Sequence, residues 1–501
     1  MTLSFHHMTF THDGAANPLF ADVTAHFDSG WTGVAGVNGS GKTTILRLAA
    51  GQLEAQEGKI QRPAHAVLCP QRTDVAPSRL TEFLAATDAD ACVLRGRLRV
   101  GDDWDVRWQT LSHGERKRAQ IAVALWQQPD VLLVDEPTNH IDAEARALLR
   151  EALTTFHGIG IVVSHDRELL DTLCHQCLLL SPPRAVMRPG NYSEAEVEAT
   201  RDETSKRRRR AQLHQELAQL KRESKRRHAK AAQADRKKSK RSLARGDSDG
   251  RAKLDLVRVS GKDGQAGRLA RQLDGRIAQL GQDVAGIEVD PQHHTRFWLE
   301  GSVSPRRVLF ALPAERLPLG RERTLHIPAI TMLRDDRFAV TGANGLGKST
   351  FLRHILQRID LEPDRLVYLP QEIDLDGTRR IMNAVRRLPR EDRGRVFTVV
   401  SALGSDPKRL LQNDDASPGE LRKVLLALGI IRQPYLIVMD EPTNHLDLAS
   451  IACLERALGD CPCGLLLVSH DLPFLSAVTR TRWQLHAEGS EVALGMHRRA
   501  H

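Results

Sequence analysis

The sequence has few cysteines, and they are not spaced for a metal site or a disulfide framework. Seven cysteines in 501 residues are too few for a disulfide scaffold, and their odd number leaves at least one thiol unpaired. Cys174 and Cys177 have the CxxC spacing, but no second pair stands nearby to complete a zinc site. Cys461 and Cys463 are too close together to provide one. We therefore expect no zinc, and we interpret the thiols as buried or incidental.

The sequence also has no apolar segment long enough for a membrane. Runs such as those at residues 131–134 and 465–468 have the length of strands, whereas a helix that crosses a bilayer needs about 20 apolar residues. The first residues lack the basic start and the apolar stretch of a signal peptide. We expect a cytoplasmic protein that does not contact membranes.

Five motifs occur twice along the chain in the same order. Each copy has a GxxxxGK[ST] loop, a glutamine, a Ser-x-Gly-Glu segment, an apolar run ending in Asp-Glu, and a Ser-His-Asp segment. They lie at residues 36–43, 71, 112–115, 131–136 and 164–166 in the first copy, and at 342–349, 371, 417–420, 436–441 and 469–471 in the second. In both copies the serine precedes the aspartate by 23 residues, and the aspartate precedes the histidine by 30. The chain therefore contains an internal repeat, and we call the copies the first and second repeat.

The glycine-rich loops predict two ATP sites. Such a loop between a strand and a helix turns backbone N–H groups toward phosphates at the positive end of the helix. The residues expected to hold the nucleotide are Gly36, Asn38, Gly39, Ser40, Gly41, Lys42, Thr43 and Thr44 in the first repeat, and Gly342, Asn344, Gly345, Gly347, Lys348, Ser349 and Thr350 in the second. The two lysines would reach the β- and γ-phosphates.

Other motifs supply groups for metal binding and hydrolysis. The expected Mg²⁺ ligands are Thr43, Gln71 and Asp135 in the first repeat, and Ser349, Gln371 and Asp440 in the second. Glu136 and Glu441 directly follow the aspartates and would polarise the attacking water as general bases. His165 and His470 also follow apolar strands and would contact the γ-phosphate from the other side. These four residues are the predicted catalytic groups of an ATPase.

The strings Glu-Pro-Thr-Asn-His-x-Asp at residues 136–142 and 441–447 are the most specific part of the pattern. Together with the Ser-x-Gly-Glu segments, they make the chain resemble the ABC-F family of ATP-binding cassette proteins. The resemblance implies an α/β fold with two P-loop NTPase cassettes in one polypeptide. It also implies that the chain has no membrane domain and that a charged linker joins the cassettes.

The resemblance further implies that each ATP lies between the loop of one cassette and the Ser-x-Gly-Glu signature of the other. Lys42 would then face Ser417, and Lys348 would face Ser112. The signature residues expected to bind nucleotide are Ser112, Gly114, Ser417 and Gly419. We expect a monomer whose two cassettes pair within one chain.

Both signatures depart from the Ser-Gly-Gly-Glu that is usual in the family. His113 stands at the second position in one copy and Pro418 in the other, and proline has no backbone N–H to give a phosphate. Serine followed by proline and glutamate also reads as a helix start with a capping box, which would leave the N–H groups of Gly419 and Glu420 pointing at a phosphate. We expect both sites to bind ATP, and the Lys42 site to be the less active one.

An aromatic or imidazole ring upstream of the loop often stacks on adenine in cassettes of this kind. In the first repeat His12, with Phe10 nearby, stands at the corresponding place. We assign no such residue in the second repeat.

The middle of the chain is strongly basic. Between residues 201 and 245 there are 18 Lys and Arg against 5 Asp and Glu. Residues 192–243 contain no Gly or Pro, which favours a helix. The glycines within residues 246–267 should break this helix. We expect a second helix after them. Apolar residues form one stripe on each predicted helix, Leu213, Leu217 and Leu220 on the first and Leu269, Leu273, Ile277, Leu280 and Val284 on the second. The stripes predict an antiparallel coiled-coil hairpin.

We therefore divide the chain into a first ATP-binding cassette at residues 1–190, a basic helical-hairpin linker at residues 191–300, and a second cassette at residues 301–501. The excess of positive charge and the lack of aromatics between residues 201 and 245 favour recognition of RNA by shape and phosphates. The family resemblance implies the ribosome as partner, with the linker near ribosomal RNA and the P-site tRNA, in translation regulation, stall relief or antibiotic protection. The alternatives are the ATP-hydrolysing subunit of an exporter with separate membrane subunits, and a chromosome-associated ATPase.

Overall fold

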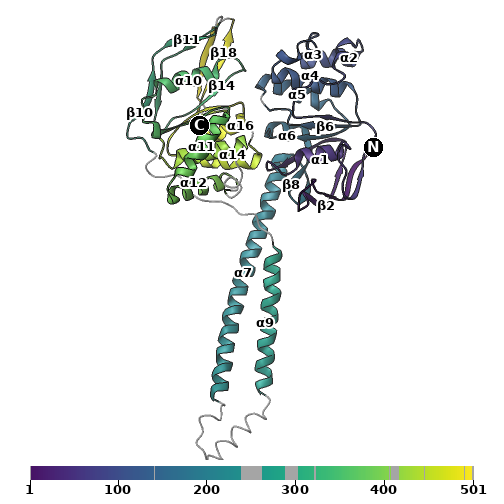
Figure 1. The fold of residues 1–501 in the computed structure, drawn as a ribbon, viewed down its shortest axis with the longest axis vertical. Coiled ribbons are helices and arrows are strands. Elements are labelled where there is room, and N and C mark those ends of the chain that lie inside the picture. Colours follow the sequence, from purple (N-terminus) through teal and green to yellow (C-terminus); the bar gives the residue numbers. More distant parts are fainter. Residues whose placement is uncertain are drawn as a thin grey trace, which may run out of the picture. The chain divides into compact units, whose positions relative to one another are not determined.

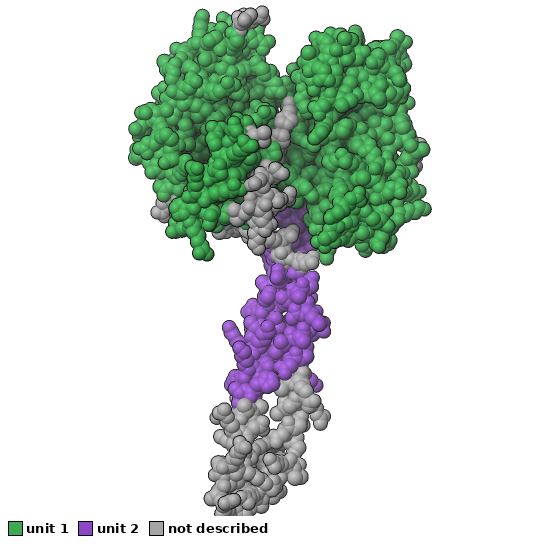
Figure 2. All heavy atoms as spheres, viewed as in Figure 1, with its two compact units in different colours: residues 1–195, 293–501 green, residues 196–292 purple. Residues whose placement is uncertain are grey.

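The computed structural model describes residues 2–139, 141–237, 262–287, 303–320, 323–405, 407, 417–444, 446–489 and 491–498. The chain divides into two compact units, residues 1–195 with 293–501, and residues 196–292 (Figure 2). Within the described ranges, no helix is both long enough and apolar enough to cross a membrane.

The first repeat contains two sheets. The smaller sheet is antiparallel, in the order β2-β1-β4, and the larger has the order β5-β6-β7-β3-β8-β9, with only β9 antiparallel to its neighbour. The strands are β1 (Leu3–Phe10), β2 (Phe20–Phe27), β3 (Gly30–Gly36), β4 (Glu57–Gln61), β5 (Ala66–Cys69), β6 (Val131–Asp135), β7 (Ile159–Val163), β8 (Cys174–Ser181) and β9 (Arg184–Pro189). Strands β6 and β7 are buried along their whole length, which explains why they read as unbroken apolar runs in the sequence.

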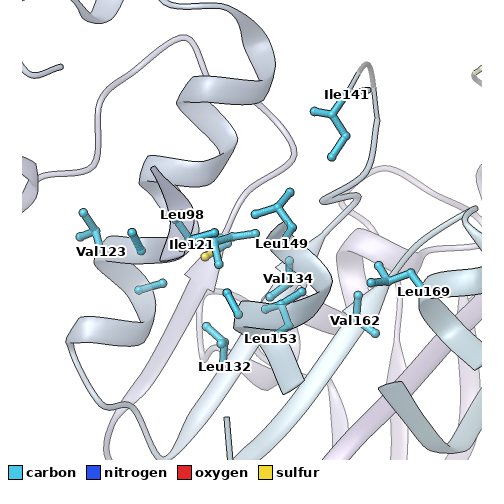
Figure 3. Packing of buried hydrophobic residues seen from close by; sticks show 14 of the residues in the cluster. Leu98, Ile121, Val123, Leu132, Val134, Ile141, Leu149, Leu153, Val162 and Leu169 are labelled. Carbon is cyan, nitrogen blue, oxygen red and sulfur yellow. The ribbon is translucent and has the colours of Figure 1, made fainter. Parts of the chain in front are cut away.

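Helices cover the larger sheet of the first repeat (Figure 1). They are α1 (Lys42–Ala49), α2 (Leu80–Ala85), α3 (Ala89–Leu98), the short 3₁₀ helix η1 (Trp108–Thr110), α4 (His113–Trp126), α5 (Ala143–Thr154) and α6 (Arg167–Leu173). Leu149 and Leu153 of α5 pack with Val134 of β6 and Val162 of β7 in one buried cluster (Figure 3). This packing fixes the ends of β6 and β7, after which the acidic and histidine motifs follow.

The second repeat has the same core. Its large sheet has the order β11-β12-β19-β18-β14-β17-β16-β15, and β10 pairs with β13 in a separate antiparallel pair. The run β15-β16-β17-β14-β18-β19 repeats the order of the first repeat. The strands are β10 (Val308–Leu312), β11 (Glu315–Leu319), β12 (Arg323–Ile327), β13 (Ile330–Leu333), β14 (Arg337–Thr341), β15 (Leu366–Leu369), β16 (Leu436–Asp440), β17 (Gly464–Val468), β18 (Thr481–Glu488) and β19 (Glu491–Arg498). The helices are α10 (Lys348–Arg358), the 3₁₀ helix η4 (Pro363–Arg365), α11 (Leu375–Arg387), α12 (Arg390–Ala402), α14 (Pro418–Ile430), α15 (Leu448–Gly459) and α16 (Leu472–Val478).

Two long helices form the basic middle of the chain, α7 (Tyr192–Lys237) and α9 (Lys262–Gly286), which lie side by side in Figure 1. Arg276 of α9 pairs with Glu216 of α7 at 3.1 Å, and Ser224 donates a hydrogen bond to Asp274 at 3.1 Å. Leu217, Leu280 and Val284 of the predicted stripes are buried, and Leu213, Leu220, Leu273 and Ile277 are half-buried. The side chain of Leu269 lies outside the described part.

One prediction about these helices is wrong, and another is only partly covered. Gly264 and Gly267 were expected to break the chain, but both lie inside α9, which begins at Lys262. A glycine costs about 1 kcal/mol relative to alanine within a helix, and neighbours that favour helix, such as Ala266 and Arg268, outweigh this local cost. The expected end of the first helix, residues 238–243, lies outside the described residues.

Candidate active sites

Each glycine-rich loop joins a central strand to a helix that begins at the loop lysine. β3 leads into α1 and β14 into α10. The N-cap residues Gly41 and Gly347 have φ values of 89° and 88°, a left-handed conformation that glycine adopts at little cost. Both helices lack a side-chain cap and an acidic residue in their first turn. Their first N–H groups therefore remain available to an anion.

The loop lysines are buried and fold back over their own loops. Lys42 Nζ donates to the carbonyl oxygen of Gly36 at 3.0 Å, and Lys348 Nζ to that of Gly342 at 2.9 Å. Burial lowers the pKa of both lysines, and the nearby carboxylates oppose this shift. The structure thus brings one ammonium group to the centre of each loop.

A hydroxyl group and a carboxylate meet at the start of each of these helices. Thr43 Oγ1 donates to Asp135 Oδ2 at 2.7 Å. In the second repeat a hydrogen bond from Ser349 opposes the rise that burial causes in the pKa of Asp440. Hydroxyl and carboxylate oxygens are the ligands that Mg²⁺ prefers in such loops. Four of the six residues expected to bind the metal are therefore brought together in two pairs.

Glu136 and Glu441 are buried and have an unusual backbone conformation. Their φ values are 46° and 50°, in the left-handed region where a residue other than glycine is strained by about 1–3 kcal/mol. The backbone N–H of each donates at 2.8 Å to the neighbouring strand, at Val163 O and Val468 O, which holds the strained turn. Burial raises the pKa of Glu136 to about 8 and that of Glu441 to about 7, near the working pH of a general base.

The two histidines lie against these glutamates. His165 Nε2 is 3.1 Å from Glu136 Oε1, and His470 Nε2 is 3.5 Å from Glu441 Oε1. His470 Nε2 also lies 3.0 Å from Asn344 Oδ1. Burial and nearby cations lower the pKa of His470 to about 3, so its imidazole is neutral. With its proton on Nε2, the neutral ring would donate to Asn344 Oδ1.

The signature segments begin helices α4 and α14, each with the capping box that the sequence predicts for the second repeat. Ser417 Oγ accepts from the Glu420 N–H at 3.3 Å, while the Ser417 N–H donates to the Glu420 carboxylate at 2.9 Å. Pro418 occupies the first turn, as expected. The Glu420 N–H was expected to point at a phosphate, but here it is engaged by the cap. Gly419 is then left to supply the free N–H at this helix start.

Gln71 and Gln371 are exposed, and buried cations hold their backbone. Lys117 Nζ donates to the carbonyl oxygens of Pro70 at 2.7 Å and Gln71 at 3.2 Å. Arg422 occupies the matching position of α14 and donates to the carbonyl oxygen of Gln371. Sequence reasoning missed both cations. The signal that could have found them is a basic residue three positions after the signature glycine in both repeats.

The loops also contact the opposite repeat. The backbone N–H of Asn38 donates to Asp447 Oδ2 at 2.8 Å, and that of Asn344 donates to Asp142 Oδ2 at 3.4 Å. A cavity of about 380 Å³ borders the second loop and includes Lys348, Ser349, Thr350, Gly345, Gly347, Gln371, Asp440, Glu441 and His470, with Ile141 and Arg146 of the first repeat.

His12, the residue expected to stack on adenine, lies beside the first loop. His12 Nε2 lies 3.4 Å from Thr44 Oγ1, and its ring meets that of Phe10 edge-on.

The residues fit ATP and Mg²⁺. Ser40 Oγ is buried and has no hydrogen-bond partner within the described part of the chain, so it is ready for a ligand. A Cβ added to Gly39 or Gly345 would meet nothing within 4 Å, which leaves room beside each loop. A Cβ on Gly41 would clash with Leu19 and Phe20 at 2.7 Å, which explains why glycine is needed there.

Comparison with known proteins agrees with this geometry. A family model described as "ABC transporter" matches residues 21–139 and 325–444. The chain is 29% identical to the ATP-binding protein Uup of Caulobacter vibrioides over 96% of its own length and 76% of that protein. It is 27% identical to the ribosome protection protein VmlR of Bacillus subtilis over 95% of its length and 85% of that protein. An archaeal ribosome recycling factor, aABCE1, solved with the stalk protein aP1, has a similar fold: the TM-score is 0.63 at 16% identity, over 97% of this chain and 89% of the other.

Proposed function

The chain belongs to the ABC-F family of ATP-binding cassette proteins and is an ATPase, and we propose that it binds the ribosome and couples ATP to placement of its basic linker there. The observation that carries this proposal is the combination of two complete loop sites with the basic helix α7. VmlR, by its name, protects ribosomes, and this chain aligns with it almost throughout. The action would then be regulation of translation, relief of stalling or protection from an antibiotic, in the cytoplasm.

We propose that each ATP lies between the loop of one repeat and the signature of the other, in a monomer divided into cassettes at residues 1–190 and 301–501 and a linker at residues 191–300. The contacts of Asn38 with Asp447 and of Asn344 with Asp142 support this arrangement, because each joins a loop to the opposite repeat. Residues 141 and 146 of the first repeat also border the second cavity. Lys42 would face Ser417, and Lys348 would face Ser112.

Within each site the residues would divide the work. The loop N–H groups and the lysines bind the phosphates, and the hydroxyl-carboxylate pairs Thr43–Asp135 and Ser349–Asp440, with Gln71 and Gln371, would hold Mg²⁺. Mg²⁺, when bound, neutralises charge that develops on the phosphates.

Glu136 and Glu441 would accept a proton from the attacking water, which their raised pKa values suit. His470, neutral with its proton on Nε2, would donate to the γ-phosphate, and His165 would do the same in the first site. His12 would stack on adenine there.

The linker would bind RNA through its phosphates. Arg208 and Arg209 of α7 are exposed, and within the described residues neither pairs with an acid, whereas Arg207 lies 3.5 Å from Glu203. Exposed cations without partners on one helix are suited to phosphate contacts, which make binding depend strongly on salt.

Co-sedimentation of the full chain would test the proposal. The Glu136→Gln, Glu441→Gln double variant, with ATP, should pellet with purified ribosomes and not with lipid vesicles or DNA. Recovery with vesicles would favour the exporter subunit, and recovery with DNA would favour the chromosome-associated ATPase. Either result, without ribosome binding, overturns the proposal.

A further inference from the structure

Arg146 makes the surroundings of the two candidate sites unequal. It lies on α5, ten residues after Glu136, and the residue ten positions after Glu441 is Ile451. The two repeats therefore place an arginine and an isoleucine at matching positions of the helix that follows the Glu-Pro-Thr-Asn-His-x-Asp string. The difference matters because this helix meets the opposite repeat.

The guanidinium of Arg146 reaches the histidine loop of the second repeat. Its Nη1 donates to the backbone carbonyl oxygen of His470 at 3.2 Å, and it lies 3.9 Å from Asp166 Oδ2 of its own repeat. The side chain is 23% exposed and borders the cavity that contains Lys348 and Glu441. Its Nε is buried without a hydrogen-bond partner among the described residues. A cation of the first repeat thus stands at the second site.

The contact with His470 bears on chemistry because this residue touches two other groups of the site. Its backbone N–H donates to Glu441 Oε2 at 3.3 Å, and its imidazole lies beside Asn344. A donor that holds the carbonyl oxygen of His470 restrains the backbone between these contacts. An isoleucine cannot do this for the first site, because its side chain has no donor.

A second contact runs in the same direction. Arg167 of the first repeat donates to both carboxylate oxygens of Glu455 in the second, at 3.0 and 3.2 Å. At the matching positions, 305 residues from each, stand Leu472 and Arg150, which cannot form that ion pair. Arginines of the first repeat therefore approach the second repeat in two places.

We propose that Arg146 is a positioning residue of the Lys348 site, where it orders the His470 loop from the opposite repeat. The inference rests on the proposed hydrolysis of ATP at that site and not on ribosome binding. At the first site the matching residue is Ile451, which has no side-chain donor. The His165 loop therefore receives no such hydrogen bond from that position of the opposite repeat.

Steady-state ATPase measurements without ribosomes, in two backgrounds, test the kinetic part. With Glu136→Gln only the Lys348 site has its glutamate, and Arg146→Ile should lower kcat about five- to tenfold with little change in KM, as expected for a lost charged hydrogen bond that positions a group. In the Glu441→Gln background the same change should have little effect. Arg146→Lys should recover most of the rate. Arg150→Ile, one turn further along α5, removes an arginine that pairs within its own repeat and serves as the control.

Hydrogen exchange of the full chain gives a readout that does not need turnover. Arg146→Ile should speed exchange of the backbone amides in residues 469–475, and Arg150→Ile should not. An equal loss of kcat in both backgrounds, or unchanged exchange at residues 469–475, overturns the proposal. If the Lys348 site did not hydrolyse ATP, Glu441→Gln alone would leave turnover intact, which separates that failure from this one.

Discussion

Replacing Lys117 by methionine should lower both the stability and the ATPase turnover of the protein. Lys117 is 0% exposed, and its ammonium holds the carbonyl oxygens of Pro70 and Gln71. Methionine has nearly the same length and fills the same space, so the change removes the charge and the two hydrogen bonds without opening a large cavity.

The magnitude follows from two opposing effects. A hydrogen bond from a charged group contributes about 1.5–3 kcal/mol, and the two bonds that Lys117 donates are part-buried. Removing a buried charge returns part of the cost of its desolvation, a cost that is evident here because burial lowers the pKa of Lys117 to about 8. We expect a net loss of about 2 kcal/mol, which lowers Tm by roughly 4–8 °C. Because the segment that carries Gln71 loses its anchor, turnover should fall roughly tenfold.

The pH dependence gives a second check with a definite sign. Burial lowers the pKa of Lys117 from 10.5, the ordinary value of an exposed lysine, to about 8 in the folded protein. Between these values the unfolded chain binds the additional proton, so the stability of the wild type rises with pH in this window. The methionine variant lacks this gain, and the difference in Tm between the two proteins should widen from pH 8 toward pH 10.

Thermal unfolding at pH 7.5 and 9.5, together with ATPase rates, measures these effects. Lys59→Met, at an exposed position of β4, is the matched control and should change Tm by less than about 2 °C. If Lys117→Met had the Tm of the wild type at both pH values, the proposed role of this buried cation would be refuted.

Three further results are expected. Glu136→Gln combined with Glu441→Gln should keep ATP binding and lower hydrolysis at least a hundredfold, in line with the roughly 10²–10⁴-fold worth of a general base. Alanine at Arg208 and Arg209 should weaken ribosome binding and reduce the slope of log K against log salt by roughly one to two, with ATPase activity unchanged without ribosomes. Glu441→Gln alone should reduce turnover more than Glu136→Gln alone does. Pro418→Gly should raise turnover above that of the wild type.

For each of these expectations, one outcome would contradict the reasoning. Hydrolysis by the double glutamine variant within about threefold of the wild type would remove the glutamates from the role of general base. A salt slope for the arginine variant equal to that of Arg97→Ala, Arg307→Ala, which removes two exposed charges from the cassettes, would show that α7 is only a solvated surface. Equal losses from the two single glutamine variants, with no gain from Pro418→Gly, would show that the sites work as equals.

The sequence predicted the parts of the sites that depend on short-range order. Gly41 and Gly347 mark the loops because a left-handed N-cap next to crowded side chains admits only glycine. The buried strands β6 and β16 read as apolar runs, so the acidic residues at their ends could be placed in advance. The capping box at Ser417 could be read for the same reason, since it joins residues three positions apart.

Long-range contacts could not be read in this way. The hydrogen bond from Arg146 to His470 joins residues 324 positions apart, and no local pattern marks an arginine on a helix as a partner of another repeat. The left-handed backbone of Glu136 and Glu441 is also set by tertiary contacts, since glutamate has no preference for positive φ. The low helix propensity of glycine also gave a wrong start for α9. Gly264 and Gly267 suggested a break, whereas the helix begins before them, at Lys262.

We attribute the expected inequality of the two sites to differences on both of their faces. The serine cap engages the N–H of Glu420 in one signature and that of Glu115 in the other. The signatures therefore differ at Pro418, which has no N–H, so the helix end that would face Lys42 offers one donor fewer than a Gly-Gly signature would. At the Lys348 site the guanidinium of Arg146 from the opposite repeat contacts the His470 loop, and in the proposed arrangement the signature would add the backbone N–H of His113. Placed donors stabilise a transferring phosphoryl group more than they stabilise bound ATP. Both differences leave ATP binding possible at Lys42, and we expect them to favour hydrolysis at Lys348.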